Sequence, residues 1–256
     1  MRAYDLIKET FNRKLYILIV HISWLVLYGM FYWLTLPDAG EISGFGRFIF
    51  IWGGFFLALA LSAGIFGDDI SSGRICVLVT KPFWTGELYI YRLLGLSLQA
   101  AVHFILAWFV IFILHIFMSK GSMENLGLWL FASWLLFNTC AALSTSLSVV
   151  VGRTYNALLL LVVFVTGFFV ISWLMHATRQ QAETGVLFSF IKYACPPFEL
   201  LSKFAGGEYG KYSLTVGRFS LAKSVACVVH SLILAVFYSV VGIVLLSRRQ
   251  FSRVLN

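Results

Sequence analysis

The sequence predicts an all-α membrane protein with six transmembrane helices, an N-terminal interfacial helix and short re-entrant outer helices before the last span. Composition is the first observation: of 256 residues, 60% are hydrophobic and 12% charged, and the mean hydropathy is +0.90. Soluble domains are roughly 45–50% apolar and about 25% charged. The length of the apolar runs and the placement of Lys and Arg between them are the second and third observations.

Six apolar stretches are long enough to cross a bilayer, which takes about 20 residues of helix. The predicted spans are 15–36, 48–66, 93–118, 127–151, 157–175 and 222–246. The first ends before Pro37, and the fourth and fifth are separated by the short segment 152–156. We expect the whole chain, 1–256, to form one membrane domain.

Basic residues predict the orientation, because cytoplasmic segments of membrane proteins are enriched in Lys and Arg. With the N-terminus inside, the short outer loops hold Arg47 and Lys120. The inner segments hold eleven basic residues: Arg2, Lys8, Arg13, Lys14, Arg74, Lys81, Arg92, Arg153, Arg248, Arg249 and Arg253. Both termini are therefore predicted to be cytoplasmic, and the formal net charge of +8 is explained by topology rather than by nucleic-acid binding.

Two segments outside the spans have a helical pattern. Residues 1–14 place Tyr4, Ile7 and Phe11 on one face, which favours a helix lying in the membrane interface. The alternative is an ordinary charged extension of the first span. The outer segment 176–221 is interpreted as two short re-entrant helices, one over 185–192 and one starting near Pro197.

Motifs for several other functions are absent or incomplete. The segment before Lys211 resembles a phosphate-binding loop, but it lacks the first glycine and has Tyr212 where Ser or Thr would bind magnesium. The four cysteines form no C-x-x-C pair, and no His/Cys cluster has zinc spacing. All eleven acidic residues fall at span ends or in loops, so the paired carboxylates of an intramembrane enzyme are missing. We therefore expect no cofactor and no metal in this chain.

Histidines inside the spans are candidate functional groups, because ionisable residues at membrane depth are costly. They are His21, His103, His115 and His230. A hydrogen bond between helices is their commoner use, and catalysis or metal binding is the alternative. Gln99 and His103, four residues apart, share one helical face that could contact a neighbouring span.

The segment 67–92, between the second and third spans, is predicted to be a structured cytoplasmic loop. Pro82 ends a short apolar run, and Thr85 can cap a new short helix with Glu87 in its first turn. Such a helix could press on a soluble partner; the alternative is a structured loop without a partner. Six residues stand out at fixed spacing: Asp69, Gly73, Pro82, Glu87, Arg92 and Gly95.

This spacing resembles the loop signature of type-2 ABC exporter permeases, the six-span membrane subunits of ATP-binding cassette exporters. Lys81-Pro82 and the stretch from Pro197 to Glu199 are most similar to the NosY-like subgroup. The resemblance implies that 67–92 is a coupling loop that docks on a separate cytoplasmic ATPase, with Glu87 and Arg92 near the docking surface and Gly73 and Gly95 permitting close helix approach.

The resemblance also implies partners and a location. ATP and magnesium would be bound by the partner ATPase, and a second permease copy or a related chain would complete the transporter in the cytoplasmic membrane of a bacterium. An alternative is a mechanotransmission permease that acts on an extracytoplasmic partner without passing a substrate. A second alternative, an intramembrane enzyme, lacks the convergent polar residues that it would need.

Overall fold

Helices make up nearly all of the structure, a computed structural model. It describes residues 3–35, 46, 48–79, 84–118, 126–170, 193–206, 213–216 and 219–249. In chain order the elements are α1 (Ala3–Arg13), α2 (Leu15–Thr35), the π-helix η1 (Phe50–Phe56), α4 (Leu57–Ser62), α5 (Gly67–Ser71), α6 (Arg74–Val79), α7 (Thr85–Met118), α8 (Leu126–Ser148), α9 (Arg153–Phe164), the π-helix η2 (Val165–Val170), α12 (Phe198–Ala205), β1 (Ser213–Val216), β2 (Phe219–Ala222) and α13 (Lys223–Arg248).

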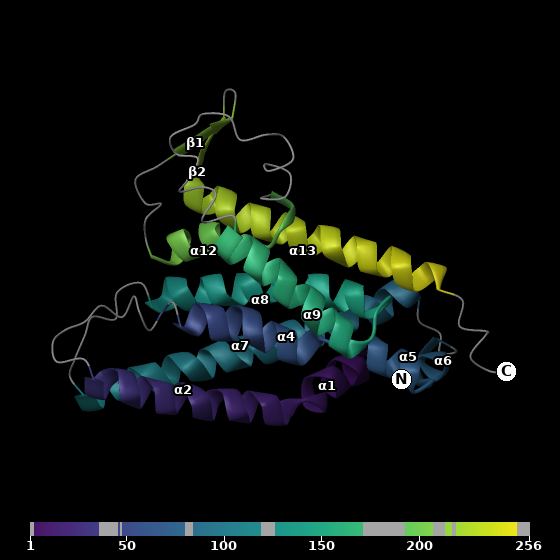
Figure 1. The fold of residues 1–256 in the computed structure, drawn as a ribbon, viewed down its shortest axis with the longest axis horizontal. Helices are drawn as coiled ribbons and strands as arrows, with labels where there is room; N and C mark the ends of the chain where they lie inside the picture. The colour runs from purple at the N-terminus through teal and green to yellow at the C-terminus, as the bar shows by residue number, and fades with distance from the viewer. Residues whose placement is uncertain are drawn as a thin grey trace.

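The long helices run along one axis and alternate in direction, with α8 and α4 between α13 on one side and α7 and α2 on the other (Figure 1). Four helical stretches are long and apolar enough to cross a membrane: Phe50–Ser71, Thr85–Phe117, Leu126–Ser148 and Lys223–Arg248. A fifth forms if α1 and α2, which meet at a bend of 46°, count as one span. The described part of the fifth predicted span is shorter, with an apolar helix at Arg153–Gly167. The membrane-protein fold is thus confirmed at the level of four to five candidate spans.

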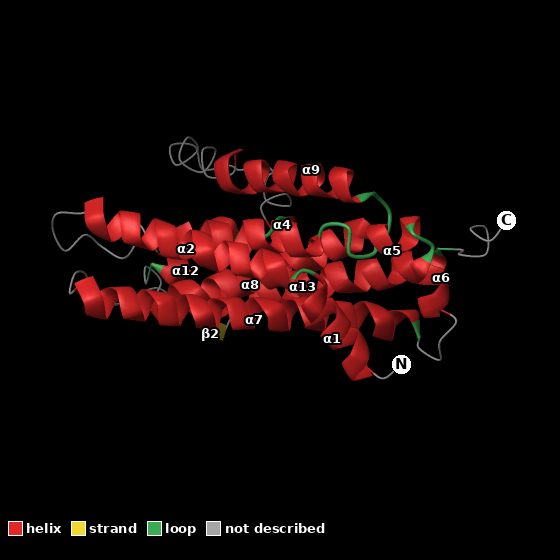
Figure 2. Ribbon diagram, turned by 90° about the horizontal axis from the view of Figure 1, so that it is seen from below, coloured by secondary structure: helices red, strands yellow, loops and turns green. Residues whose placement is uncertain are grey.

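The segments predicted to be cytoplasmic gather at one end of the bundle. The start of α1, the helices α5 and α6, the start of α9 and the end of α13 lie there together (Figures 1 and 2). The backbone N–H of Phe66 donates to Ser148 Oγ at 3.4 Å, and Arg249 donates to the carbonyl of Val149. These bonds join the α4–α5 turn and the end of α13 to the end of α8. We call this end of the bundle the loop end.

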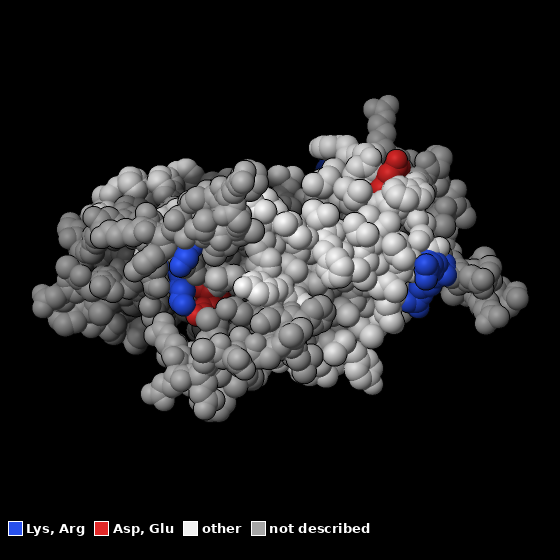
Figure 3. All heavy atoms as spheres, turned by 90° about the horizontal axis from the view of Figure 1, so that it is seen from above, with Lys and Arg blue, Asp and Glu red and all other residues white. Residues whose placement is uncertain are grey.

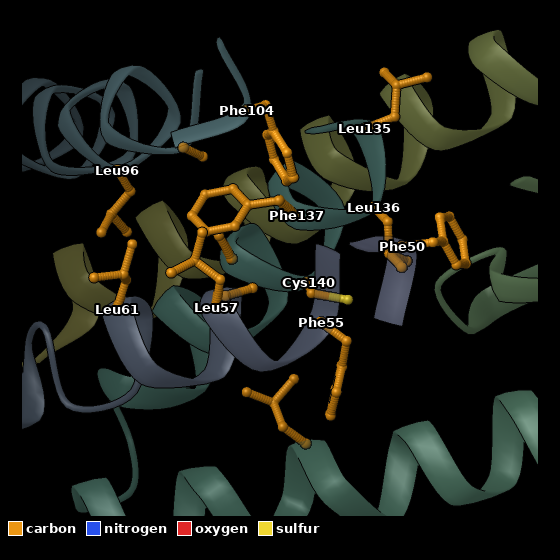
Figure 4. Close-up of a cluster of buried hydrophobic side chains, with 14 of the residues drawn as sticks. Phe50, Phe55, Leu57, Leu61, Leu96, Phe104, Leu135, Leu136, Phe137 and Cys140 are labelled. Atoms are coloured by element: carbon orange, nitrogen blue, oxygen red, sulfur yellow. The ribbon is translucent and has the colours of Figure 1, made fainter. Parts of the chain in front are cut away.

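The core lies around α8, where Leu135, Leu136 and Phe137 are almost completely buried. Figure 4 shows Phe137 and Phe104 beside Leu57 and Leu61, side chains from α8, α7 and α4. Glycines permit this close packing. A Cβ added to Gly53 would lie 2.6 Å from Phe104, and one added to Gly54 would lie 2.9 Å from Leu136. Both glycines belong to η1, a π-helical turn that the sequence did not predict.

Apolar side chains cover most of the outside, as expected for a surface that faces lipid. Exposed large hydrophobic residues include Ile19 and Val20 on α2, Phe117 on α7 and Val236 on α13. In the view of Figure 3, the middle of the described surface is almost uncharged, and acidic and basic side chains show toward the two ends. This pattern suits a bundle whose middle lies in hydrocarbon.

The segment 176–221 differs in part from the prediction. Pro196 and Pro197 do precede a short helix, α12, whose buried face packs on α8. The predicted helix over 185–192 lies outside the described residues. The antiparallel hairpin of β1 and β2, in which Ser213 pairs with Ala222, was not predicted. The alternation of polar and apolar residues on both sides of Gly217-Arg218 is the sequence signal that could have predicted it.

The N-terminal helix forms as predicted, and the side that it packs on the bundle was not predicted. Leu6 and Thr10 are buried, whereas Tyr4 of the predicted apolar face is exposed. The buried face packs against α7, because Gly95 of α7 leaves room for Thr10. The exposed Tyr4 is free to meet the membrane interface, and the inward face brings charged residues of α1 to the segment 67–92.

Candidate functional site

Buried charges at the loop end connect three helices. Arg92 of α7 donates to Glu9 Oε1 of α1 at 2.8 Å and to Asp69 Oδ2 of α5 at 3.0 Å. The side chains of Arg92 and Asp69 have no solvent exposure. We call Glu9, Arg13, Asp69, Arg74 and Arg92 the ion cluster. Because each charge meets an opposite charge from another element, the cluster fixes α1, α5 and α7 to one another at this end.

Arg13 and Arg74, the more exposed members of the ion cluster, pair with the two carboxylates on the solvent side. Arg13 Nη1 lies 3.0 Å from Asp69 Oδ1, and Arg74 Nη2 lies 2.9 Å from Glu9 Oε1. The Thr10 hydroxyl accepts a hydrogen bond from Arg92 at 3.1 Å and donates to the carbonyl of Leu6 at 2.8 Å. Three arginines against two carboxylates leave the cluster with one excess positive charge, and the more exposed Arg74 and Arg13 carry the solvent side.

Lys14, next to the ion cluster, holds the end of the second predicted span. Its ammonium donates to the carbonyls of Ala60 at 2.9 Å, Leu61 at 2.9 Å and Ala63 at 3.2 Å. The last carbonyls of a helix have no partner within the helix, so this cation caps α4. Burial, followed by the positive charge of Arg153, lowers the pKa of Lys14 to about 8. The residue therefore ties the α1–α2 bend to the end of α4.

Two of the six predicted loop residues, Asp69 and Arg92, meet in the ion cluster. The side chain of Arg92 is fully buried, so it offers no direct contact to a partner, and its predicted place near a docking surface stays a prediction. Glu87 is exposed in the first turn of α7, as predicted. The predicted separate short helix starting at Thr85 is instead the first part of the continuous 34-residue α7. Pro82 lies outside the described residues.

The two glycines of the loop signature, Gly73 and Gly95, are required for different structural reasons. A Cβ on Gly95 would lie 2.7 Å from the Cβ of Thr10 and 3.0 Å from the carbonyl oxygen of Ile7, so close approach of α1 to α7 requires glycine there. Gly73 instead has φ +70°, the left-handed conformation that turns the chain between α5 and α6. The expectation of close helix approach at Gly73 is wrong, since a Cβ there would meet nothing within 4 Å.

Tyr89 supports the same region from the α8 and α13 side. It is fully buried, stacks on Phe66 with ring centroids 5.6 Å apart, and donates to the carbonyl of Ala142 at 3.1 Å. Gly242 of α13 lies directly against its ring, because an added Cβ would be 2.5 Å away. The start of α7 is therefore packed against the turn before α5, against α8 and against α13.

Glu9, Thr10 and Arg13 contact residues of the segment 67–92, and these contacts were not predicted. Their signal is spacing: Glu9 and Arg13 are four residues apart and so lie on one face of α1. The Lys14 interaction was also missed, because its acceptors are backbone carbonyls. Partners of this kind depend on how α1 docks, which its own sequence does not state.

Two of the histidines predicted to lie inside the spans contact each other, and a third lies apart from them. His21 of α2 contacts His103 of α7, with ring centroids 4.4 Å apart, so the predicted contact of the Gln99–His103 face with a neighbouring span is confirmed. His230 lies 3.0 Å from the carbonyl of Tyr193. Within the described ranges, no group of three or more His, Cys, Asp or Glu residues is placed to hold a metal ion.

Comparison with protein-family models and with curated proteins finds no match to this chain. Assignment of a function therefore depends on the loop spacing, the ion cluster and the arrangement of the helices.

Proposed function

We propose that the chain is the permease subunit of an ATP-binding cassette exporter, which couples ATP hydrolysis by a separate ATPase to export across the cytoplasmic membrane. In this proposal the chain crosses the membrane six times with both termini in the cytoplasm, and a second copy or a related chain completes the transporter. The alternation of α2, η1–α4, α7, α8, α9–η2 and α13 along one axis supports six crossings (Figure 1).

The ion cluster is the observation that carries the proposal. A coupling loop has to transmit a push from a soluble partner to the spans without yielding. Asp69 and Arg92, both part of the exporter-like spacing, form a buried pair that joins the loop helix α5 to α7 and, through Glu9, to α1. Force applied at the loop would therefore move α1, α5 and the start of α7 together.

The contact surface for the ATPase is assigned to the exposed start of α7. Glu87 and Trp84 are exposed there, and Arg74 of the ion cluster is partly exposed nearby in the loop. Glu87 is three residues from Trp84, on the first turn of the helix, so its carboxylate suits a basic residue of a partner. The loop thus presents an acidic and an aromatic side chain next to the helices that the ion cluster joins.

Charge reversal tests this assignment. In membranes co-expressing the chain with its ATPase subunit, Glu87→Arg should lower both recovery of the complex and its ATP turnover by about tenfold. The reason is that an arginine would repel the basic residue of the partner that Glu87 attracts. Asn12→Arg is the matched control, because Asn12 is exposed on α1 at the same end but outside the loop. Equal recovery and turnover in the two variants would contradict the proposal.

A further inference from the structure

Three polar side chains lie near the contact of α2 with α7, inside the predicted spans: the half-buried His21 of α2 and the buried Gln99 and His103 of α7. His21 is eight residues beyond Arg13, and Gln99 and His103 are seven and eleven residues beyond Arg92. At about 1.5 Å per residue, these groups lie about 10 to 17 Å from the ion cluster, well inside a hydrocarbon layer about 30 Å thick. Gln99 and His103 have no solvent exposure.

Most of the polar atoms of these side chains lack a hydrogen bond. Five of their buried polar atoms have no hydrogen-bond partner among the described residues: His21 Nδ1, Gln99 Nε2 and Oε1, and His103 Nδ1 and Nε2. A buried donor or acceptor without a partner costs free energy, and low dielectric raises that cost. An arrangement serving only to join α2 to α7 would use hydrogen bonds between the helices, as neighbouring polar residues in spans commonly do.

The remaining nitrogen of His21 shows how the site is oriented. Nε2 lies 3.1 Å from the carbonyl of Trp52, to which it can donate, and this leaves Nδ1 as an acceptor directed away from that bond. Trp52 belongs to η1, where its carbonyl also accepts the backbone N–H of Leu57. π-helical turns of this kind are frequent at functional sites.

The helix α2 is placed to move without breaking the ion cluster. It meets α1 at a 46° bend, and α1 is held by Glu9 and Arg13. Beyond the bend, α2 packs on α7 and, to a lesser extent, on α4, and its other side is exposed at Ile19 and Val20. Separation of α2 from α7 would therefore swing about an anchored base and open the contact of His21 with His103, with Gln99 one turn away on the same face of α7.

We infer that His21, Gln99 and His103 form a polar subsite that receives an uncharged, hydrogen-bonding group of the cargo when α2 moves away from α7. This inference rests on the proposed function. The imidazoles and the amide can both donate and accept hydrogen bonds. No ion pair of the described residues includes them, so an ion bound here would lack a counter-charge, which apolar surroundings make costly.

Reaction of an introduced thiol tests the opening. In a background with Cys76, Cys140, Cys195 and Cys227 replaced, and in complex with the ATPase, His103→Cys should react at least about tenfold faster with 2-hydroxyethyl methanethiosulfonate when a non-hydrolysable ATP analogue is bound. Ala141→Cys is the matched control: Ala141 is completely buried in the core on α8, away from the α2–α7 contact, and should stay unreactive in both states. An unreactive thiol at 103 in a complex that turns over ATP would overturn the inference and leave the proposed function standing.

The same variant tests the chemical class. The hydroxyethyl reagent should react at least about tenfold faster than the ethylammonium and sulfonatoethyl reagents, which carry a positive and a negative charge. A faster reaction with either charged reagent would overturn the assignment of an uncharged group.

A stability measurement tests the subsite without the ATPase, and so applies even if no complex forms and the proposed function fails. The double variant Gln99→Met, His103→Leu replaces the unpaired polar atoms of α7 with apolar groups of similar size. It should raise the thermal midpoint of the purified chain by about 2 °C or more. A lowered midpoint would show that the polar atoms stabilise the fold, and would overturn the inference.

Discussion

Arg92 carries a full positive charge at a position with no solvent exposure, and it contacts carboxylates from two different helices. Its contribution to the free energy of unfolding depends on both carboxylates, because desolvating a guanidinium costs several kcal/mol unless opposite charges and hydrogen bonds compensate. Glu9, Asp69 and Thr10 supply that compensation. Removal of the guanidinium would leave Asp69 buried with Arg13 as its remaining partner.

Comparison of two arginines that share one acceptor tests this dependence. Arg92→Met should lower the free energy of unfolding by about 3–5 kcal/mol, because it breaks a buried pair. Arg74→Met should cost less than about 1 kcal/mol, since Arg74 binds the same Glu9 oxygen at 2.9 Å but is 44% exposed. Denaturant unfolding in lipid nanodiscs measures both. Equal losses in the two variants would show that burial does not set the strength of the cluster.

At the scale of the elements, α1 and α7 are joined by a contact that depends on one missing methyl group. The backbone of α1 at Ile7 and the side chain of Thr10 occupy the space that a Cβ on Gly95 would need. Thr10 cannot move far, because its hydroxyl is bonded to both Leu6 and Arg92. Packing of α1 and the geometry of the ion cluster are therefore coupled.

Gly95→Ala should accordingly push α1 away from α7 and lower the free energy of unfolding by about 1–3 kcal/mol, the usual cost of overpacking. Gly127→Ala is the matched control, because Gly127 also lies in a long helix, α8, and has nothing within 4 Å of an added Cβ. That variant should be neutral or slightly stabilising, as alanine favours helix. Thermal unfolding of the two purified variants checks the difference. A Gly95→Ala protein as stable as the parent would contradict the tight α1–α7 contact.

Local sequence patterns predicted several helix boundaries closely. The helix α2 begins at Leu15 as expected, α7 begins at Thr85, and α13 starts at Lys223, one residue after the predicted position. Charged residues, prolines and the end of an apolar run set a helix boundary within a few residues of themselves. The local sequence is therefore enough to predict such boundaries. The π-helical turn η1 in the second span was not predicted, because it depends on how Gly53 and Gly54 pack against side chains of α7 and α8.

Long-range pairing could not be predicted in the same way. Glu9 and Arg92 are separated by 83 positions, and nothing local to either residue names the other. The sequence marked Asp69 and Arg92 as notable through their spacing and placed Arg92 toward a partner. Both side chains are buried, and their ion pairs with Glu9 and Arg13 join them to α1. Glu87, on the open side of α7, keeps the exposure that its position in the first turn predicted.

For the whole molecule, the loop end unites segments from α1 to α13. Hydrogen bonds of Phe66 with Ser148 and of Arg249 with Val149 bring the turns after α4 and α8 and the end of α13 to one level. Tyr193 lies at the opposite end, bonded to His230 near the start of α13. Basic residues concentrate in the segments of the loop end, which favours its placement in the cytoplasm.

Labelling from the two sides of the membrane tests this orientation. With the natural cysteines replaced, single cysteines are introduced by Ser71→Cys, Tyr155→Cys and Ser247→Cys at the loop end and by Tyr193→Cys at the other. All four positions are exposed. An impermeant maleimide should label the first three only in inverted vesicles and the fourth only in intact cells, because an even number of crossings returns the chain to its starting side. Labelling of the Tyr155→Cys protein in intact cells would show that position 155 lies outside the cell. That result would contradict the predicted fourth and fifth crossings and so the six-span arrangement.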